Sequence, residues 1–304
     1  MIRPRNLLPG DTICVVGPSR KIAAGQTEVA KAVFEQWGLN VVFGAHTFAD
    51  EHSYLASTDA HRVADLNDAI RDNRVNAIIA ARGGYGITRI VDKIDFSALK
   101  DQPKWMIGFS DITALHLAMF SRDLISVHGM MPLLFGEPDA EVSIESLKQL
   151  LFAGHHQYHL NSNPSNRPGV TEGRLIGGNL SLIVESLGTK TEIETDNCIL
   201  VIEEIDEYKY KVDRMLHQLK RAGKLSNLAG LIVGHMTQIN DSSLAFGDSV
   251  EEIICNATDE YRYPVAFDFP CGHAQPNLAF MHGALYSLSV ESSGSTVTSR
   301  SIVL

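Results

Sequence analysis

Residues 10–135 alternate short, unbroken apolar runs with segments of helical periodicity, and this alternation restricts the possible folds most strongly. Continuous apolar runs predict strands buried on both faces, and the helices between them cover those faces. We expect strands at 12–16, 40–43, 77–81, 104–109 and 125–128, and helices at 26–37, 58–70, 87–94 and 111–120. The pattern predicts an α/β domain with a parallel sheet.

The pattern is interrupted after residue 135 and restarts near residue 173. With 304 residues the chain is long enough for two domains. We therefore predict an N-terminal domain at 1–135, a connection rich in Pro, Gly and polar residues at 136–172, and a C-terminal domain at 173–304. The expected elements beyond residue 135 are a helix at 143–152, strands at 174–179, 199–204, 229–234 and 265–269, helices at 181–187 and 210–222, and a hairpin at 285–290 and 296–303.

Composition excludes some classes of function. The formal net charge of −10 disfavours a nucleic-acid surface, which needs clustered Lys and Arg. The four cysteines form no CxxC pair, so we expect free, buried thiols. The sequence contains no run of ~18 apolar residues, and Pro and charged residues interrupt its N-terminus. We expect a cytoplasmic protein that binds neither membrane nor nucleic acid.

Three turns follow predicted strands of the parallel sheet. They are Gly17-Pro18-Ser19, Arg82-Gly83-Gly84-Tyr85-Gly86, and the turn that carries Ser110. The carboxyl ends of parallel strands lie at one edge of a sheet, where such folds place their ligands. The three turns should therefore converge on a single site.

Ser110 lies where the strand 104–109 turns into the helix that starts at Asp111. A serine at such a turn projects its hydroxyl out of the sheet, and the following backbone N–H can donate to an oxyanion. The nucleophile pattern G-x-S-x-G is incomplete, because Ile112 occupies the place of the second glycine. A simple helix cap is the alternative reading of Ser110.

The Arg82–Gly86 turn permits several interpretations. Its glycines allow backbone N–H groups to approach a ligand closely, but the Lys-Ser/Thr of a phosphate loop and the spacing of a dinucleotide motif are both missing. An oxyanion or carboxylate site fits better, with Arg82 able to hold a carboxylate through two hydrogen bonds. A tight turn with a surface arginine remains the alternative.

Residues 203–207 hold four acids, Glu203, Glu204, Asp206 and Glu207, after a buried strand. They could bind a metal, form a solvated loop or orient a histidine, and the sequence does not rank these options. Twelve histidines occur, of which His128, His235 and His273 follow predicted strands. No paired His or Cys spacing typical of zinc is present, so we expect neither metal nor cofactor.

Taken together, these segments resemble the LD-carboxypeptidase family of serine peptidases. The resemblance extends over nearly the whole chain through short motifs in a shared order. They are Gly17–Ser19, Ala81–Gly86, Ile107–Thr113, His128-Gly129, Gly177–Leu180, Leu200–Glu207, Val212–Leu216 and Gly272-His273.

The resemblance implies a flavodoxin-like N-terminal domain, a smaller β-rich α/β C-terminal domain and a Ser–Glu–His triad. By motif position these residues are Ser110, Glu203 and His273, with Glu204 as the alternative acid. Phe109 stands where the family commonly has tyrosine. We expect Asp111, Gly83, Gly84 and Arg82 to bind the oxyanion or the substrate. A homodimer is also implied.

The family's main activity removes the terminal D-alanine from muropeptide tetrapeptides during peptidoglycan recycling. A microcin-C-type immunity peptidase is the alternative within the family. Such an enzyme would need an aromatic platform for a nucleotide base, and this chain has only two tryptophans, Trp37 and Trp105. Outside the family, a non-catalytic ligand-binding module and a metal-dependent hydrolase remain alternatives.

Overall fold

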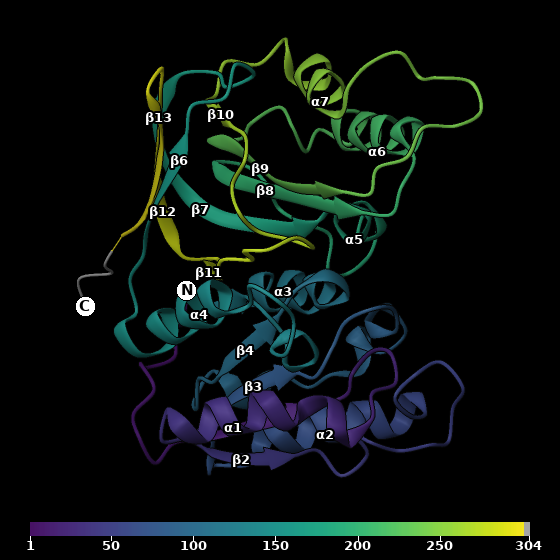
Figure 1. Cartoon of the computed structure of the whole chain (residues 1–304), viewed down its shortest axis with the longest axis vertical. Helices are drawn as coiled ribbons and strands as arrows, with labels where there is room; N and C mark the ends of the chain where they lie inside the picture. Colours follow the sequence, from purple (N-terminus) through teal and green to yellow (C-terminus); the bar gives the residue numbers. More distant parts are fainter. Residues whose placement is uncertain (301–304) are drawn as a thin grey trace. The chain divides into compact units, whose positions relative to one another are not determined.

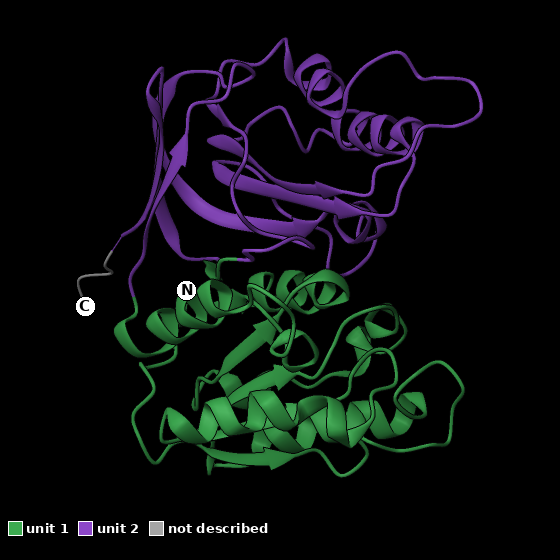
Figure 2. Ribbon diagram, viewed as in Figure 1, with its two compact units in different colours: residues 1–154, 278–282 green, residues 155–277, 283–304 purple. Residues whose placement is uncertain are grey.

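The computed structural model of the chain describes residues 1–300 and divides into two compact units. Unit 1 contains residues 1–154 and 278–282, whereas unit 2 contains residues 155–277 and the segment from 283 onward (Figure 2). The chain therefore passes between the units after residues 154, 277 and 282. The two units are described separately below.

Unit 1 is built on a six-stranded sheet with the order β11-β5-β4-β3-β1-β2. Its strands are β1 (Thr12–Val16), β2 (Asn40–Phe43), β3 (Val75–Ala80), β4 (Trp105–Gly108), β5 (Ser126–His128) and β11 (Phe280–His282). Strands β1 to β5 run parallel to one another, and β11 pairs antiparallel with β5. The parallel part has the strand order of flavodoxin-like folds, which confirms the predicted fold class.

Four α-helices accompany this sheet (Figure 1). They are α1 (Glu28–Gln36), α2 (Asp59–Arg71), α3 (Thr113–Phe120) and α4 (Glu141–Ala153). The connections β1–β2 and β2–β3 run in opposite directions along the sheet, so right-handed crossovers place α1 and α2 on opposite faces. Thr58 caps α2, because its side chain accepts a hydrogen bond from the His61 N–H.

The helix expected at 87–94 is replaced by two 3-10 helices, η2 (Ile87–Arg89) and η3 (Val91–Lys93). Between them Ile90 adopts φ −125° and ψ −17°, outside the α-helical region, which prevents a continuous α-helix. The other 3-10 helices of unit 1 are η1 (Ala24–Thr27), η4 (Ser97–Leu99), η5 (Ser110–Ile112) and η6 (Pro132–Leu134).

Unit 2 is built on a mixed seven-stranded sheet with the order β10-β9-β8-β7-β12-β13-β6. Its strands are β6 (Gln157–Asn161), β7 (Gly169–Asn179), β8 (Cys198–Ile205), β9 (Gly230–Thr237), β10 (Val265–Ala266), β12 (Leu285–Glu291) and β13 (Gly294–Ser299). Strands β7 to β10 are parallel, whereas β12, β13 and β6 add antiparallel strands beyond β7. This matches the predicted β-rich second domain. The helices of unit 2 are α5 (Leu180–Glu185), α6 (Lys209–Arg221) and α7 (Val250–Thr258).

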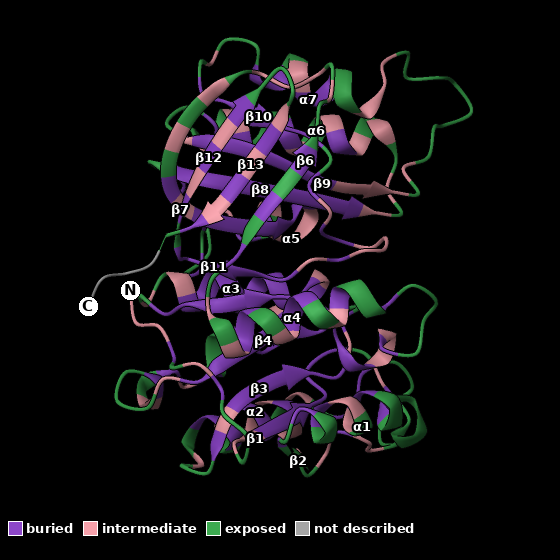
Figure 3. Ribbon diagram, turned by 60° about the vertical axis from the view of Figure 1, so that its left-hand side comes forward, coloured by how far each residue is buried: buried purple, intermediate pink, exposed green. Residues whose placement is uncertain are grey.

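The cores of both units lie along their central strands (Figure 3). Every residue of β4 is buried, and β8 is buried from Cys198 to Glu204. All four cysteines are free thiols; Cys14, Cys198 and Cys271 are buried, and Cys255 is half-buried. Among residues 1–300, every helix is too short or too polar to cross a membrane.

Residues 136–172 do not form a separate connection between the units. Residues 136–154 belong to unit 1 and include α4, whose Leu147, Leu150 and Leu151 are fully buried. Residues 155–172 belong to unit 2, where β6 alternates exposed and buried residues as the last strand of the sheet. The helix α4 matches the helix expected at 143–152, whereas the polar and Pro residues of this stretch concealed β6.

Two further elements were absent from the prediction, α7 and the three-residue strand β11. A strand as short as β11 shows no periodicity, and only its pairing with the distant β5 defines it. Strand β10 ends at Ala266, earlier than predicted. The terminal hairpin is present as β12 and β13, and residues 301–303 of its predicted second strand lie outside the described residues.

Candidate active site

Ser110 lies in a strained turn after β4. The strand ends at Gly108, Phe109 is extended, and Ser110 begins η5 with φ +64° before α3 starts at Thr113. A positive φ is uncommon for serine and is tolerated only where the surrounding structure imposes it. The turn therefore has the geometry expected for a strand-to-helix nucleophile.

Ile112, which stands in place of the second glycine of the nucleophile pattern, packs against the first glycine, Gly108. A Cβ added at Gly108 would lie 2.7 Å from Cγ1 of Ile112, so the isoleucine side chain covers this glycine. Ile112 is fully buried, as is Phe109 beside it at 2% exposure. Gly108, on the strand side of Ser110, is thus a position in this turn with no room for a side chain.

The side chain of Asp111 holds neighbouring turns together. Its Oδ2 accepts hydrogen bonds from the Ser19 hydroxyl at 2.6 Å and from the Ile87 N–H at 3.0 Å. Asp111 is 1% exposed, and this burial raises the pKa of its carboxyl group. The contacts show that the turns after β1, β3 and β4 converge, as the sheet topology predicted.

Arg62 of α2 braces the same turns from another direction. Its guanidinium donates to the carbonyl oxygens of Pro18 and of Gly86, the latter at 2.9 Å, and to Asp59 Oδ1 at 2.6 Å. It is 1% exposed, an unusual burial for arginine. Sequence analysis missed this role, because an arginine in a polar helix is normally a surface residue.

The glycines of the 82–86 turn allow close approach to neighbouring groups. A Cβ added at Gly83 would lie 3.2 Å from Cβ and 3.3 Å from Oγ of Ser110, so this backbone lies against the nucleophile candidate. Gly84 has a φ of +115°, and a Cβ added there would lie 2.9 Å from Cβ of Arg20. Side chains at these two positions would therefore disturb the surroundings of Ser110.

Arg82 is half-buried and donates from Nη1 to the Lys21 carbonyl oxygen at 3.2 Å. Burial, and to a lesser extent the nearby charge of Arg20, lower the pKa of Arg82. Its Nε is buried without a hydrogen-bond partner among residues 1–300. Arg82 is thus oriented within the turn, and part of its donor capacity is left for another group.

His116 supports the strand end below Ser110. Its Nε2 is 2.9 Å from the Gly108 carbonyl oxygen and its Nδ1 is 2.8 Å from the Ser126 hydroxyl. A carbonyl only accepts, so Nε2 carries the proton and Nδ1 accepts from Ser126. Complete burial lowers the pKa of His116 to about 4, which keeps the ring neutral near neutral pH.

In unit 2, Glu203 and His273 are in direct contact. Glu203 Oε2 lies 2.7 Å from Nδ1 of His273. Glu203 is fully buried, whereas the His273 side chain is 16% exposed. The carboxylate thus holds the ring of His273 through Nδ1, and this contact fixes the orientation of the ring.

Two glycines make room for the Glu203 side chain. A Cβ added at Gly272, which has φ +118°, would lie 2.7 Å from Glu203 Oε2. One added at Gly234 would lie 3.2 Å from Glu203 Cβ. The Gly272 N–H also donates to Asn277 Oδ1 at 3.0 Å, which closes the loop that carries His273. Position 272 therefore has to be a glycine, because any side chain there would collide with the carboxylate of Glu203.

Glu204 faces different partners. Its carboxylate accepts from the Ser181 N–H at 2.8 Å, the Ser181 hydroxyl at 2.7 Å and the Asn179 amide at 2.9 Å. Burial raises the pKa of its carboxyl group despite these donors. Glu204 therefore ties the start of α5 to β8, and these hydrogen bonds distinguish it from Glu203, which contacts His273.

The other acids and histidines singled out in the sequence lie in separate environments. Glu207 forms an ion pair with Lys211 at 2.8 Å. His128 is buried beside Phe280, and His235 Nδ1 accepts from the Ala274 N–H at 3.3 Å. Residues 1–300 contain no group of three or more His, Cys, Asp or Glu side chains that could hold a metal ion.

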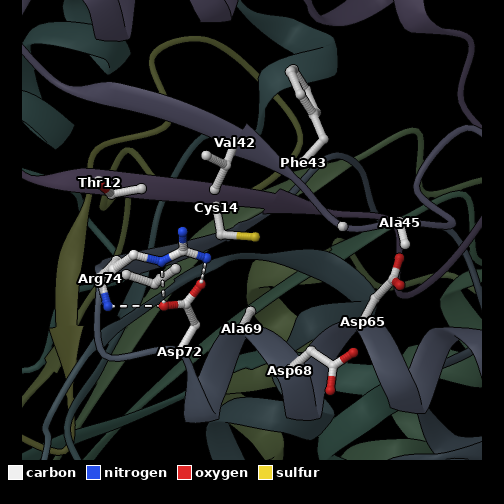
Figure 4. Close-up of a pocket in the computed structure, with 12 residues that line it drawn as sticks. Thr12, Cys14, Val42, Phe43, Ala45, Asp65, Asp68, Ala69, Asp72 and Arg74 are labelled. Carbon is white, nitrogen blue, oxygen red and sulfur yellow. Dashed lines mark hydrogen bonds and ion pairs between the residues drawn. The ribbon is translucent and has the colours of Figure 1, made fainter.

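Cavities are present within each of the two units of the described chain. One in unit 1, of about 350 Å³, is lined by the first residues of β1 and β3, by Cys14 and by acids of α2 (Figure 4). Burial raises the pKa of the Cys14 thiol to about 12, so the thiol in this cavity stays protonated. Unit 2 has one of about 420 Å³ that includes His235, Asp268 and Ala274, and one of about 700 Å³ beside Arg214 and His217.

Comparisons with known proteins identify the family of the chain. The model of the LD-carboxypeptidase N-terminal domain matches residues 13–129, and that of the C-terminal domain matches residues 172–288. A probable murein peptide carboxypeptidase of Bacillus subtilis is 37% identical over 291 residues, 93% of this chain and 90% of that protein. The chain belongs to the LD-carboxypeptidase family. It is therefore a hydrolase of the serine peptidase type.

This LD-carboxypeptidase also has relatives of lower sequence identity. A murein tetrapeptide carboxypeptidase of Pseudomonas aeruginosa is 28% identical and covers 89% of this chain and 91% of that protein. The muramoyltetrapeptide carboxypeptidase structure from Oxalobacter formigenes has a TM-score of 0.88 at 24% identity and covers 95% of this chain and 99% of that one. An MccF-like protein from Bacillus anthracis has a TM-score of 0.86 at 23% identity and covers 98% and 99%. The two structures show the shared fold.

Proposed function

We propose that this LD-carboxypeptidase releases the terminal D-alanine of murein tetrapeptides by cutting the bond between the L-centre of diaminopimelate and D-alanine. The observation that carries the proposal is the 2.7 Å contact between buried Glu203 and Nδ1 of His273. A carboxylate on Nδ1 fixes the tautomer that a general base needs and stabilises the imidazolium that forms. The strained turn at Ser110 supports the assignment of the nucleophile.

In the proposed mechanism, Nε2 of His273 takes the proton of the Ser110 hydroxyl as its oxygen attacks the peptide carbonyl carbon. The backbone N–H groups of Asp111 and of Gly83 or Gly84 stabilise the oxyanion of the tetrahedral intermediate. His273 then protonates the leaving amine of D-alanine. Water attacks the resulting acyl-enzyme with His273 again acting as base, which frees Ser110.

Arg82 is proposed to bind the free carboxylate that distinguishes a carboxypeptidase substrate. A planar guanidinium can donate two parallel hydrogen bonds to a carboxylate. Arg82 starts the turn whose Gly83 lies against Ser110, so it belongs to the correct turn for a leaving group of one residue. The cytoplasmic location and the homodimer implied by the resemblance remain predictions.

The alternatives receive less support. Membership of a serine peptidase family disfavours both the non-catalytic ligand-binding module and the metal-dependent hydrolase. The nucleotide-linked substrate of a microcin-C-type immunity peptidase would need an aromatic platform. The two tryptophans offer none, because Trp37 is 9% exposed and Trp105 is fully buried with its indole N–H on the Arg5 carbonyl.

The decisive experiment incubates the purified protein with disaccharide tetrapeptide and follows the mass of the product. Loss of one alanine residue, with free D-alanine released, is expected for the wild type. Ser110→Ala should lose ~10⁴-fold or more of this rate and should no longer be labelled by a serine-reactive phosphonate. Near-normal turnover by Ser110→Ala would exclude Ser110 as the nucleophile.

A labelled but inactive wild type would have a different meaning. Phosphonate labelling of Ser110 without release of D-alanine would keep the serine hydrolase and reject this substrate. An aminoacyl-sulfamoyl adenosine would then be the next compound to test. Chelators are expected to leave the activity unchanged, because the proposed mechanism uses no metal.

A further inference from the structure

Two arginines, Arg20 and Arg82, belong to neighbouring segments beside the turn that contacts Ser110. Arg20 follows the turn after β1, and Arg82 follows β3. The side chain of Arg20 lies against Gly84, where an added Cβ would be 2.9 Å from Arg20 Cβ. Arg82 in turn donates to the carbonyl oxygen of Lys21, the residue next to Arg20. Each arginine therefore contacts the segment that carries the other.

The position of Arg20 is held by surrounding structure. The Lys21 N–H donates to the Tyr54 carbonyl oxygen, and the Ala56 N–H donates to the Ser19 carbonyl oxygen, both at 2.9 Å. Arg20 and Leu55 form an antiparallel bridge between these bonds. The Arg20 guanidinium lies 5.2 Å from the centre of the Tyr54 ring, a cation–π contact. This pairing restricts the side chain although it is exposed to solvent.

The two guanidinium groups have no anionic partner within the described part of the chain. Neither Arg20 nor Arg82 forms an ion pair among residues 1–300. Arg82 Nε is also buried without a hydrogen-bond partner there. Like charges held close together repel each other, and the charge of Arg20 is one cause of the lowered pKa of Arg82. A bound anion would remove this unfavourable interaction.

We propose that Arg20 joins Arg82 in a two-arginine subsite for the free carboxylate of the residue that leaves. This inference rests on the carboxypeptidase activity proposed above. The leaving carboxylate carbon is three bonds from the scissile carbonyl carbon, so the two are roughly 3–4 Å apart. Consecutive Cα atoms are about 3.8 Å apart. Gly83 faces Ser110, and the next residue, Gly84, faces Arg20. The step from Gly83 to Gly84 is therefore about as long as the distance from the scissile carbonyl carbon to the leaving carboxylate carbon.

The subsite explains why the enzyme would act only at a chain end. A terminal carboxylate neutralises the two guanidinium groups, whereas an amide or a further residue leaves them without a counter-charge and adds bulk. Specificity then comes from the penalty on the wrong substrate as much as from the bond to the right one. Arg82 supplies an oriented, half-buried donor, and Arg20 supplies a second charge from the solvent side.

The test compares a murein tetrapeptide with its C-terminal amide. For Arg20→Met we expect kcat/KM on the free acid to fall about 10- to 100-fold, as for loss of a charge-assisted hydrogen bond. The amide should be affected less than about threefold, so the preference for the free acid collapses. Arg20→Lys should retain part of the preference, because it keeps the charge but not the planar fork.

Arg74→Met is the matched control. Arg74 is an arginine of unit 1 with an 86% exposed side chain, and it pairs with Asp72 before β3 starts. The substitution changes the net charge by the same amount and should leave the acid-to-amide preference unchanged. Melting temperatures of all variants, and their labelling by an uncharged serine-reactive phosphonate, show that the fold and Ser110 are intact.

A second measurement separates this inference from the choice of substrate. Free D-alanine should slow phosphonate labelling of the wild type, D-alaninamide should do so less, and Arg20→Met should lose the difference. This readout needs no turnover, so it applies even if the tetrapeptide is not cleaved. Equal protection of wild type and Arg20→Met by D-alanine, or an unchanged acid-to-amide preference in Arg20→Met, would overturn the role of Arg20.

Discussion

Glu203→Gln tests the pairing of Glu203 with His273 most directly. The substitution keeps the size of the side chain and removes its charge. A glutamine in this position has two orientations. Its amide oxygen can accept from Nδ1–H of His273, as the carboxylate does, or its NH₂ group can donate to Nδ1. The second orientation moves the histidine proton to Nε2, where it prevents the ring from acting as a base.

The surroundings of Glu203 decide between the two orientations. Glu203 Oε1 is buried and has no hydrogen-bond partner among residues 1–300. The catalytically useful orientation puts the NH₂ group at this place, where an unsatisfied buried donor costs about 1–3 kcal/mol. The inactive orientation satisfies the NH₂ group on His273. The useful orientation should therefore be populated about 5- to 150-fold less than the inactive one.

Loss of the charge adds a second factor. A hydrogen bond to a charged group is stronger than a neutral one by about 1–1.5 kcal/mol, which corresponds to about 5- to 10-fold in rate. The two factors together predict that Glu203→Gln lowers kcat by about 25- to 1,500-fold. We expect KM to change little, because neither factor concerns the binding of the ground state.

The assay measures release of D-alanine per protein molecule that can be labelled at Ser110, which corrects for misfolded material. Glu204→Gln is the matched control, since Glu204 is the adjacent buried glutamate and bonds Ser181 and Asn179. It should lower stability but retain most of the turnover per labelled molecule. If Glu204→Gln lost activity while Glu203→Gln kept more than a tenth of it, the assignment of the acid would be refuted.

Three further predictions concern the supporting structure. Gly272→Ala would place a Cβ 2.7 Å from Glu203, so it should destabilise the protein by more than the strain of about 1–3 kcal/mol expected from the φ of +118° alone. Gly247→Ala is the control, because Gly247 has a φ of +104° but open space around it. In urea unfolding, Gly247→Ala should show only the effect of backbone strain. Burial lowers the pKa of His116 from 6.5 to about 4, so below pH 6.5 the unfolded chain binds a proton that the folded protein does not. The free energy of unfolding should therefore fall by about 3 kcal/mol between pH 6.5 and pH 4. The fall should be smaller for His116→Gln. Burial raises the pKa of Asp111, so wild-type stability should decline relative to Asp111→Asn as pH rises through that pKa; an opposite trend in unfolding free energies would contradict the assignment.

The sequence determined the parallel sheet of unit 1 and the general position of the candidate residues. Unbroken apolar runs such as 12–16 and 105–108 are buried on both faces in the structure, and hydrophobic burial requires little more than this local pattern. The three turns at the strand ends followed from the same logic, because parallel strands bring their carboxyl ends to one edge. The contact of Glu203 with His273 was expected only through resemblance to a family.

Other features were decided by tertiary structure alone. The strand β11, the buried role of Arg62 and the closeness of Arg20 to Arg82 all depend on residues that are distant in sequence. A three-residue strand or a single arginine carries no periodic signal of its own. Periodicity reports which face of an element is buried, whereas the partner of a polar side chain is set by chain segments that meet only after folding. For this reason the sequence located the turns, and the packing of those turns determined which charges lie beside Ser110.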